Sequence, residues 1–331
     1  MKLFKITASL LLITLLATVL SSCSVTYPPL ARGLNLGNSL EAKPGEDWGL
    51  TIKNEYFDII KSAGFDHVRL PVRFNSYFKD GNLDENFMQT LDGFIDYAIS
   101  KKLSVILDFH HFDELYSDAE KNENDFYQIW QILSNRYKKY NNYLIFELLN
   151  EPRGTVSDEK WNKMLAHTID IVRQTNRQRK IIVDAGFWSN WEHIENLELP
   201  KDDNIIVAFH YYNPQPFTFQ GDPYNGYKDT RGVTWGSDDD KEYLNNSFAK
   251  VKEWAVKNNR DIILNEFGAA KTVPENLRQD WINSVRQAAE NNGFAWTYWE
   301  FSTGFGIYDT QDNAWDENIL NCLIIKEAGR H

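Results

Sequence analysis

The residues Leu144-Ile145-Phe146-Glu147-Leu148-Leu149-Asn150-Glu151-Pro152 form a short apolar run that closes with a glutamate and a proline. A second stretch, Asp261-Ile262-Ile263-Leu264-Asn265-Glu266-Phe267-Gly268, has the same form. Apolar runs of this length, bounded by turn residues, predict buried strands. Each strand would end in a glutamate, and an α/β barrel carries its functional groups at the carboxyl ends of its strands.

Similar runs alternate with segments of helical period along the rest of the chain. The expected strands are Gly33–Asn38, His67–Val72, Ser104–His110, Tyr143–Asn150, Lys180–Ala185, Asn204–Tyr212, Asp261–Glu266 and Phe294–Glu300. The expected helices are Thr51–Ala63, Asp84–Lys101, Asn124–Tyr140, Ser157–Asn176, Asp238–Lys257, Pro274–Asn291 and Glu317–Glu327, with a short or irregular segment near Trp191–Asn196. This alternation predicts a single-domain (β/α)8 TIM barrel. No glycine-rich phosphate loop follows the first strand, which argues against a dinucleotide-binding fold.

Capping residues support the expected helix starts. Ser157-Asp158-Glu159 and Ser237-Asp238-Asp239-Asp240 each place a serine N-cap before acidic residues. We therefore interpret the aspartate run as a helix start rather than a calcium site. The long connection from Asn213 to Gly236 follows the sixth strand, and we expect it to overhang the barrel mouth.

The amino terminus has the features of an export signal. Lys2 and Lys5 precede an apolar run over residues 6–20. As a helix this run would reach about 22 Å and fall short of the ~30 Å bilayer core, so a signal peptide fits better than a membrane span. Leu20-Ser21-Ser22-Cys23 resembles the lipobox of bacterial lipoproteins, where cleavage precedes a cysteine that becomes lipidated. The alternative is an ordinary secretory leader with an incidental cysteine.

This interpretation divides the chain into three parts. Residues 1–22 would be a lipoprotein signal peptide, residues 23–31 a tether, and residues 32–331 the barrel domain. The protein would then cross the bacterial inner membrane and remain anchored through Cys23, in the periplasm or at the cell surface. We expect a monomer that contacts the membrane only through this lipid.

Cysteine content and charge exclude other classes of protein. Cys23 and Cys322 are the only cysteines in the sequence, so no disulfide framework is expected and a packed core must provide the stability. The formal net charge of −12 argues against a nucleic acid partner, because a net acidic protein repels phosphate backbones.

Reactive side chains gather where the expected strands end. They are Arg69, His110, His111, Asn150, Glu151, His210, Tyr212, Glu266, Trp299 and Glu300. Two carboxylates that face one gap at a barrel rim are what cleavage of a glycosidic bond requires. The His110-His111 pair suggests a metal site, but adjacent strand residues point to opposite faces. We therefore expect neither a metal nor an organic cofactor.

The motifs now resemble those of glycoside hydrolase family 5, the cellulase family, over Arg32 to about Ile325. The matching segments are Arg69-Leu70-Pro71-Val72, Leu107-Asp108-Phe109-His110-His111, Leu149-Asn150-Glu151-Pro152, Phe209-His210-Tyr211-Tyr212-Asn213-Pro214, Asn265-Glu266-Phe267-Gly268 and Trp299-Glu300-Phe301. Asn-Glu-Pro alone would be moderate evidence, whereas the ordered series at barrel spacing is specific.

The resemblance implies a role for each of the two glutamates. Glu151 would be the general acid/base, with its proton retained because a second carboxylate nearby makes double ionisation costly. Glu266 would be the nucleophile, kept ionised by Arg69 and Tyr212. Family members retain anomeric configuration, so we expect a carboxyl separation near ~5.5 Å and a covalent intermediate.

The resemblance also implies supporting and substrate-binding residues. Asn150 would bind the sugar 2-hydroxyl, His110 and His210 would orient the acid and the sugar, and Trp299 would lie beneath the reacting ring. Candidates for other sugar contacts are Asn38, Glu41, His111, Trp188, Tyr224, Trp235 and Glu300. For the aromatic candidates, simple packing is an equally good explanation. Asp108 is expected to be a partner inside the barrel, and Glu147 has no assigned role.

The expected function is a retaining endo-β-1,4-glucanase that acts on β-1,4-linked polysaccharide, with glucomannan or mannan as further substrates. One alternative is a dedicated endo-β-1,4-mannanase, because glucose and mannose differ only at C2. An alternative of another class is a surface lipoprotein that binds glycans without cleaving them. Such proteins usually lose one catalytic carboxylate, whereas this chain has both.

Overall fold

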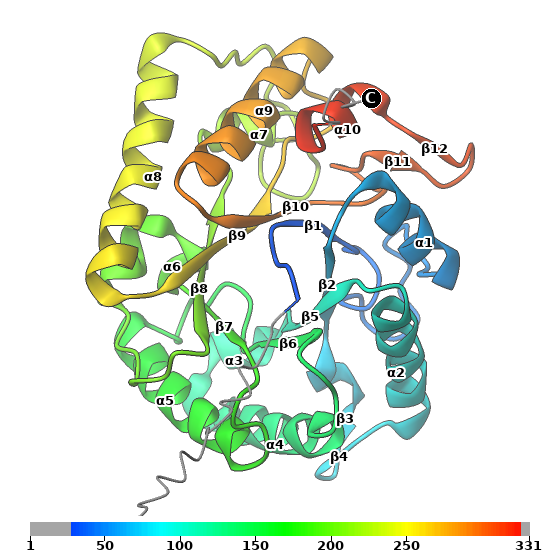
Figure 1. Ribbon diagram of the computed structural model, residues 1–331, viewed down its shortest axis with the longest axis vertical. Coiled ribbons are helices and arrows are strands. Elements are labelled where there is room, and N and C mark those ends of the chain that lie inside the picture. The colour runs from blue at the N-terminus through cyan, green and yellow to red at the C-terminus, as the bar shows by residue number, and fades with distance from the viewer. Residues whose placement is uncertain (1–27, 326–331) are drawn as a thin grey trace, which may run out of the picture.

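Eight parallel strands close into a barrel in the computed structural model, which describes residues 28–325. Around the barrel the strands follow the order β1, β10, β9, β8, β7, β6, β5, β2 (Figure 1). Their bounds are β1 Arg32–Asn35, β2 His67–Val72, β5 Ser104–Phe109, β6 Leu144–Glu147, β7 Ile181–Asp184, β8 Ile205–Tyr211, β9 Asp261–Phe267 and β10 Ala295–Tyr298. The predicted TIM barrel is confirmed, although several strands end earlier than expected.

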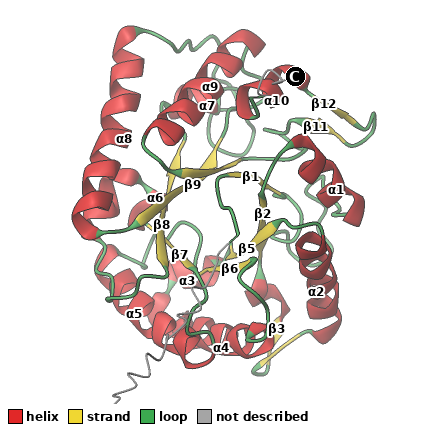
Figure 2. Cartoon of the chain, viewed as in Figure 1, coloured by secondary structure: helices red, strands yellow, loops and turns green. Residues whose placement is uncertain are grey.

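Helices surround the strands on the outside, as Figure 2 shows. The longer ones are α1 Asn54–Ala63, α2 Glu85–Ser100, α4 Ala119–Tyr137, α5 Asp158–Thr175, α8 Asp238–Asn258, α9 Glu275–Asn291 and α10 Glu317–Leu323. Short elements decorate the connections: α3 Asp113–Ser117, α6 Gly186–Ser189, α7 Gln215–Thr218, the 3-10 helices η1 Phe74–Tyr77 and η2 Trp191–Asn196, and the small strand pairs β3 Phe78–Lys79 with β4 Asn82–Leu83 and β11 Tyr308–Asp309 with β12 Ala314–Trp315.

The helix starts follow the capping chemistry of the sequence. Ser237 and Asp240 form a reciprocal capping box at the start of α8, which confirms that the aspartate run begins a helix. Two predicted starts were wrong: α1 begins at Asn54, three residues after the expected Thr51, and α4 begins at Ala119, five residues before the expected Asn124. Its N-cap is Asp118, whose side chain accepts a hydrogen bond from the Lys121 N–H.

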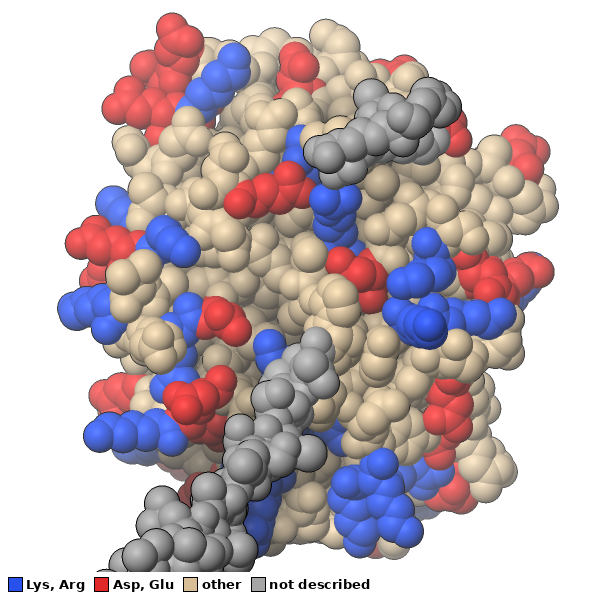
Figure 3. All heavy atoms as spheres, viewed as in Figure 1, with Lys and Arg blue, Asp and Glu red and all other residues tan. Residues whose placement is uncertain are grey.

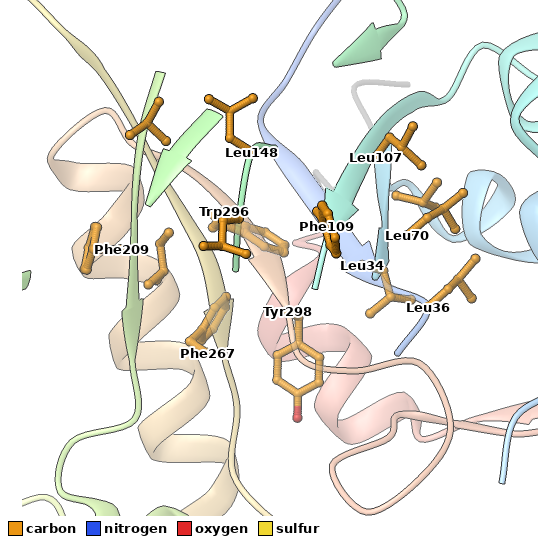
Figure 4. Close-up of a cluster of buried hydrophobic side chains, with 14 of the residues drawn as sticks. Leu34, Leu36, Leu70, Leu107, Phe109, Leu148, Phe209, Phe267, Trp296 and Tyr298 are labelled. Carbon is orange, nitrogen blue, oxygen red and sulfur yellow. The ribbon is translucent and has the colours of Figure 1, made fainter. Parts of the chain in front are cut away.

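Side chains of alternate strand residues build two separate apolar layers. Those that point outward pack between the strands and the helices, and Leu107, Phe109, Phe209 and Trp296 are examples in Figure 4. Those that point inward form a small cluster inside the barrel, which we call the barrel floor: Ile106, Ile145, Ile182, Ile206, Ala208 and Ile263. Burial of both layers is the main source of stability of the fold.

The inward positions directly above the floor are polar. Along each strand, the residue two positions after a floor residue points into the same interior. The inward residues above the floor are therefore Asp108 in β5 (after Ile106), Glu147 in β6 (after Ile145), Asp184 in β7 (after Ile182) and His210 in β8 (after Ala208). All four are buried. A charged layer therefore lies immediately beneath the barrel rim.

A bulge in β9 re-aims the second glutamate. Phe209 of β8 pairs with Leu264, but the next residue, His210, pairs with Glu266, so Asn265 is an extra residue in β9. Both Asn265 and Glu266 point into the barrel, since Asn265 donates to Glu147 and Glu266 accepts from Arg69. Without the bulge, strand alternation would send Glu266 to the opposite face.

Charged side chains of both signs are interspersed around the periphery of the face shown in Figure 3. No helix within residues 28–325 is both long enough and apolar enough to cross a bilayer. The expected signal peptide and Cys23 lie outside the described residues.

Candidate active site

Arg69, on β2, is the centre of the charged layer. Its guanidinium donates a bidentate pair of hydrogen bonds to Glu147, from Nε at 2.8 Å and from Nη2 at 2.7 Å. Nη2 also donates to Asn150 Oδ1 at 2.7 Å, and Nη1 donates to Glu266 Oε1 at 2.6 Å. Burial opposes the charge of Arg69, but the surrounding carboxylates raise its pKa well above the ordinary value. Arg69 is therefore a permanent cation that holds three rim residues in place.

The geometry assigns a role to Glu147. Besides both Arg69 bonds, its Oε1 accepts a hydrogen bond from Asn265 Nδ2 at 2.8 Å. Asp108 lies beside it and contacts Arg69 Nη2 at 3.0 Å and His110 Nδ1 at 2.6 Å. From inside the barrel, Glu147 thus holds Arg69 and Asn265, and Asp108 holds Arg69 and His110. The prediction that Asp108 is a partner inside the barrel is confirmed.

Both carboxylate oxygens of Glu266 are held. Arg69 donates to Oε1, and the Tyr212 hydroxyl donates to Oε2 at 3.0 Å. The expected contacts of this glutamate with Arg69 and Tyr212 are confirmed. Burial raises the pKa of Glu266, and the positive charges of His210 and Arg69 oppose that rise.

Glu151 lies just beyond β6 in a strained backbone conformation. Its φ angle of 46° falls in the left-handed region, which costs a non-glycine residue about 1 kcal/mol or more. Its N–H donates to Asp184 Oδ2 at 3.2 Å, and its carboxylate Oε1 lies 3.0 Å from His210 Nδ1. Arg153 Nη1 lies 3.8 Å from the other carboxylate oxygen. This turn aims the Glu151 carboxylate toward Glu266.

His210 faces both glutamates through one ring nitrogen. Its Nδ1 is 3.0 Å from Glu151 and 3.6 Å from Glu266. Burial alone would lower the pKa of His210, but the charge of Glu266 and the contact with Glu151 raise it to about 9. Burial would raise the pKa of Glu151, yet the hydrogen bond with His210 lowers it overall. These shifts favour the proton on His210 within this hydrogen bond, and the expected role of Glu151 as the acid/base stays a prediction.

The carboxylates of Glu151 and Glu266 lie close together beside His210. One carboxylate oxygen of Glu151, one of Glu266 and a ring nitrogen of His210 all lie within 4.8 Å of one another. Retaining enzymes hold their carboxyl groups about 5–5.5 Å apart, whereas inverting enzymes need roughly 6.5–9.5 Å. Such a trio has the geometry to bind a metal ion, but the protonated His210 would have to lose its proton first.

His110, His111 and Trp299 form an aromatic surface at the same rim. The rings of His110 and Trp299 stack with centroids 5.6 Å apart, and the rings of His110 and His111 lie 4.5 Å apart. The argument that these histidines must face opposite ways was wrong, because β5 ends at Phe109 and strand alternation no longer applies beyond it. Burial lowers the pKa of His110 well below its usual value and that of His111 to about 4, so both are neutral.

Glu41 and Glu300, two candidates for sugar contacts, hydrogen-bond to the backbone of loops at the rim. Glu41 accepts hydrogen bonds from the N–H groups of Asn38 and Ser39, and burial raises its pKa to about 7. Glu300 accepts from the backbone of the loop that follows it, at Ser302, Thr303 and Phe305. Both side chains are buried in these loop contacts, and their expected contacts with sugar stay predictions. The Asn38 amide donates to Thr303 Oγ1 at 2.7 Å and joins the two loops.

The aromatic candidates divide into two kinds. Trp188 is 52% exposed and Tyr224 is 91% exposed, as a stacking platform requires. Trp188 also lies over the Arg153 guanidinium, 4.2 Å from its ring centroid, beside the acid. Trp235 is buried against Phe217, so the packing explanation holds there.

Sequence reasoning missed Asp184, Arg153 and Asn35. Asp184 closes the apolar run Ile181-Ile182-Val183, the same signal that identified the two glutamates. Arg153 stacks between Tyr116 and Trp188, and no periodicity predicts that contact. Asn35 accepts from Arg69 Nη1 at 3.0 Å and follows from strand alternation within β1.

Known proteins share this architecture and these motifs. The family model for cellulase, glycosyl hydrolase family 5, matches residues 31–304. Endoglucanase H of Acetivibrio thermocellus is 31% identical over 303 residues, which cover 89% of this chain and 33% of that protein. The chain thus spans a third of that relative, but it covers 91% of endoglucanase A of Ruminococcus albus, at 29% identity over 90% of this chain.

Solved structures are similar over nearly the whole described chain. The cellulose synthase subunit Z of Clostridioides difficile has a TM-score of 0.88 and 43% identity, and the match covers 89% of this chain and all of that one. The Cel5A structure of Thermotoga maritima with cellobiose has a TM-score of 0.87 and 40% identity, over 89% of this chain and 97% of that one. The family match, together with the paired glutamates at the barrel rim, shows that the chain belongs to glycosyl hydrolase family 5, the cellulase family.

Proposed function

We propose that this protein is a retaining endo-β-1,4-glucanase. The observation that carries the proposal is the geometry of Glu151 and Glu266, which each place one carboxylate oxygen within 4.8 Å of the other and near the same nitrogen, Nδ1, of His210. This spacing allows one carboxylate to attack a sugar while the other serves its leaving group. The names of its relatives, which are mostly endoglucanases, support β-1,4-glucan as the substrate.

In the first step, Glu266 attacks the anomeric carbon and displaces the departing sugar. A bond forms between a Glu266 carboxylate oxygen and that carbon while the glycosidic C–O bond breaks. The departing oxygen takes a proton from Glu151, which is supplied from His210 across their 3.0 Å contact. Arg69 and Tyr212 hold Glu266 in the orientation for attack.

In the second step, water replaces the enzyme. Glu151, now without its proton, accepts a proton from a water molecule whose oxygen bonds to the anomeric carbon. The bond to Glu266 breaks, and its carboxylate returns to the hydrogen bonds with Arg69 and Tyr212. The proton that Glu151 took from water passes to His210, which restores the starting state. Two inversions leave the sugar with its original configuration.

Replacement of each glutamate tests the roles. We expect Glu151→Gln and Glu266→Gln each to lower hydrolysis of lichenan by about 10³-fold or more. Glu151→Ala with azide should yield the β-glycosyl azide, because the anion attacks the covalent intermediate. Glu266→Ala with azide should yield the α-glycosyl azide from direct attack. Unchanged hydrolysis in either glutamine variant would overturn the assignment.

Substrate preference is the finer part of the proposal. The Thermotoga maritima Cel5A has been solved with cellobiose and also with mannotriose, at 40% and 39% identity to this chain. We expect the highest rate on barley β-glucan or carboxymethyl cellulose, a lower rate on glucomannan and the lowest on pure mannan. Activity confined to mannan would make the protein an endo-β-1,4-mannanase. No release of reducing ends from any of the four would favour a glycan-binding protein that does not cleave.

A further inference from the structure

Asp184 is a buried acid that none of the steps above uses directly. It ends β7, and its side chain is fully buried beneath the rim. Its main-chain carbonyl accepts a hydrogen bond from Trp161 Nε1 at 2.9 Å, which fixes its position. Its Oδ2 accepts from Ser189 Oγ at 2.5 Å and from the Glu151 N–H at 3.2 Å. Asp184 therefore holds the strained residue that carries the acid/base.

The same oxygen also faces His210. His210 Nε2 lies 3.7 Å from Asp184 Oδ2, and Nδ1, on the other side of the ring, lies 3.0 Å from Glu151 Oε1. Within residues 28–325, Nε2 has no hydrogen-bond partner. A carboxylate on the Nε2 side favours a protonated ring whose Nδ1–H points at Glu151. The Asp184 side chain thus contacts the main-chain N–H of Glu151 and faces the ring of His210, the proton donor to Glu151.

Other charged groups surround His210 and Asp184. Glu151 and Glu266 face the ring and raise its pKa, to which Asp184 adds a further contribution. Burial raises the pKa of Asp184 itself to about 7, with Glu147 adding to the rise and His210 opposing it. The remaining neighbours that act on one or another of these groups are Arg69, Asp108, His111, Arg153 and Tyr212.

We propose that Asp184 is a positioning residue for acid catalysis, which holds Glu151 in place and directs the proton of His210 toward it. The proposal rests on the retaining glycosidase function proposed above. Asp184 touches neither substrate nor reacting atoms, so it acts only through Glu151 and His210. Its removal should impair the step in which the leaving group needs a proton and should spare steps that do not.

Asp184→Asn tests this with two substrates. Cellopentaose has a poor leaving group that needs a proton, whereas 2,4-dinitrophenyl β-cellobioside has a leaving group that departs without one. We expect kcat/KM for cellopentaose to fall by about tenfold to a hundredfold, and kcat/KM for the aryl cellobioside to stay within about twofold. The alkaline limb of the cellopentaose profile should move about one pH unit lower, because His210 loses a nearby negative charge. The exposed Asp203→Asn, at the opposite end of the barrel, is the charge-matched control and should change nothing.

Other results would overturn the proposal or identify a failure elsewhere. Equal losses on both substrates with an unmoved alkaline limb would mean that Asp184 has a merely structural role. No loss on either substrate would contradict the proposal outright. If the wild-type enzyme cleaves neither substrate, the proposed function fails instead. A test that needs no enzyme activity is ¹⁵N NMR of the His210 ring nitrogens. The ring should titrate near pH 9 in the wild type and at a clearly lower pH in Asp184→Asn.

Discussion

Arg69 contacts the carboxylates of Asp108, Glu147 and Glu266 from a fully buried position. Burial of such charges is costly unless the partners are well placed, and removal of one partner leaves the others uncompensated. The bidentate bond with Glu147 fixes the plane of the guanidinium, which in turn sets where Glu266 and Asn150 lie. At the residue scale, the catalytic geometry thus depends on an acid with no contact to the sugar.

Glu147→Gln should therefore destabilise the fold and lower activity. The neutral amide cannot balance the charge of Arg69, and the free energy of unfolding should fall by about 3 kcal/mol. Urea denaturation followed by tryptophan fluorescence measures this change. The control is Glu85→Gln, which removes the exposed partner of Arg136 and should shift the midpoint little. A Glu147→Gln midpoint equal to that of the wild type would contradict the account.

The raised pKa of His210 predicts how activity depends on pH. The site keeps its catalytic proton until the pH rises through about 9, so on the alkaline side kcat/KM should fall as the pH passes through that value. The stability that the proton confers is fully present below the ordinary histidine pKa of ~6.5 and is lost as the pH rises through about 9. On the acid side, burial raises the pKa of Glu266. As the pH falls, Glu266 should therefore become protonated, and activity should be lost, at a higher pH than for an ordinary glutamate.

His210→Gln checks the origin of the alkaline limb. Glu151 would then hold the proton alone, and we expect the limb to move to lower pH. A limb that stays near pH 9 in this variant would assign the proton to another group.

At the scale of elements, the sequence predicted the barrel well and its rim less well. Apolar runs located all eight strands because burial on both faces leaves a continuous signal. The bulge at Asn265 left no such signal, since neither apolar alternation nor a glycine marks it. The contact between Arg69 and Glu147 joins residues 78 positions apart, and no local pattern specifies such a pair. Position at a strand end was predictable, but the partner of each side chain was not.

The ends of β9 and β10 approach too closely for an additional side chain. A Cβ at Gly268 would lie 2.2 Å from the Trp299 carbonyl oxygen, which is part of the rigid backbone. Gly268→Ala should lower the free energy of unfolding by about 2–3 kcal/mol and raise KM, because Trp299 must shift. Gly304→Ala is the matched control, because no atom lies within 4 Å of the new Cβ. In thermal melts its unfolding midpoint should equal that of the wild type. Equal unfolding midpoints for Gly268→Ala and Gly304→Ala would contradict this prediction and show that the ends of β9 and β10 can move apart.

At the scale of the whole molecule, the catalytic rim and the start of the described chain lie at opposite ends of the barrel. Leu30 packs against the barrel floor, beneath the charged layer that carries the glutamates. We propose that Cys23 is lipidated, which would attach the protein to the membrane by the end opposite its active site. Polysaccharide would then reach the rim from the side away from the bilayer.

Mass spectrometry of the membrane fraction tests the anchor. We expect acylated Cys23 as the amino-terminal residue, and Cys23→Ser should release the protein from the membrane with its activity intact. A soluble wild-type protein with a free cleaved terminus would contradict the lipoprotein proposal and would leave the catalytic account untouched.

In the proposed mechanism, Glu266 forms a covalent bond to the sugar while Glu151 donates and then accepts the proton. A slow substrate, 2,4-dinitrophenyl 2-deoxy-2-fluoro-β-cellobioside, traps that intermediate because fluorine slows its hydrolysis. Peptide mapping of the inactivated enzyme should place one fluorocellobiosyl group on Glu266, and cellobiose should restore activity by transglycosylation. A label on any other residue, or no label with the α-anomer as the first product from cellopentaose, would contradict the account.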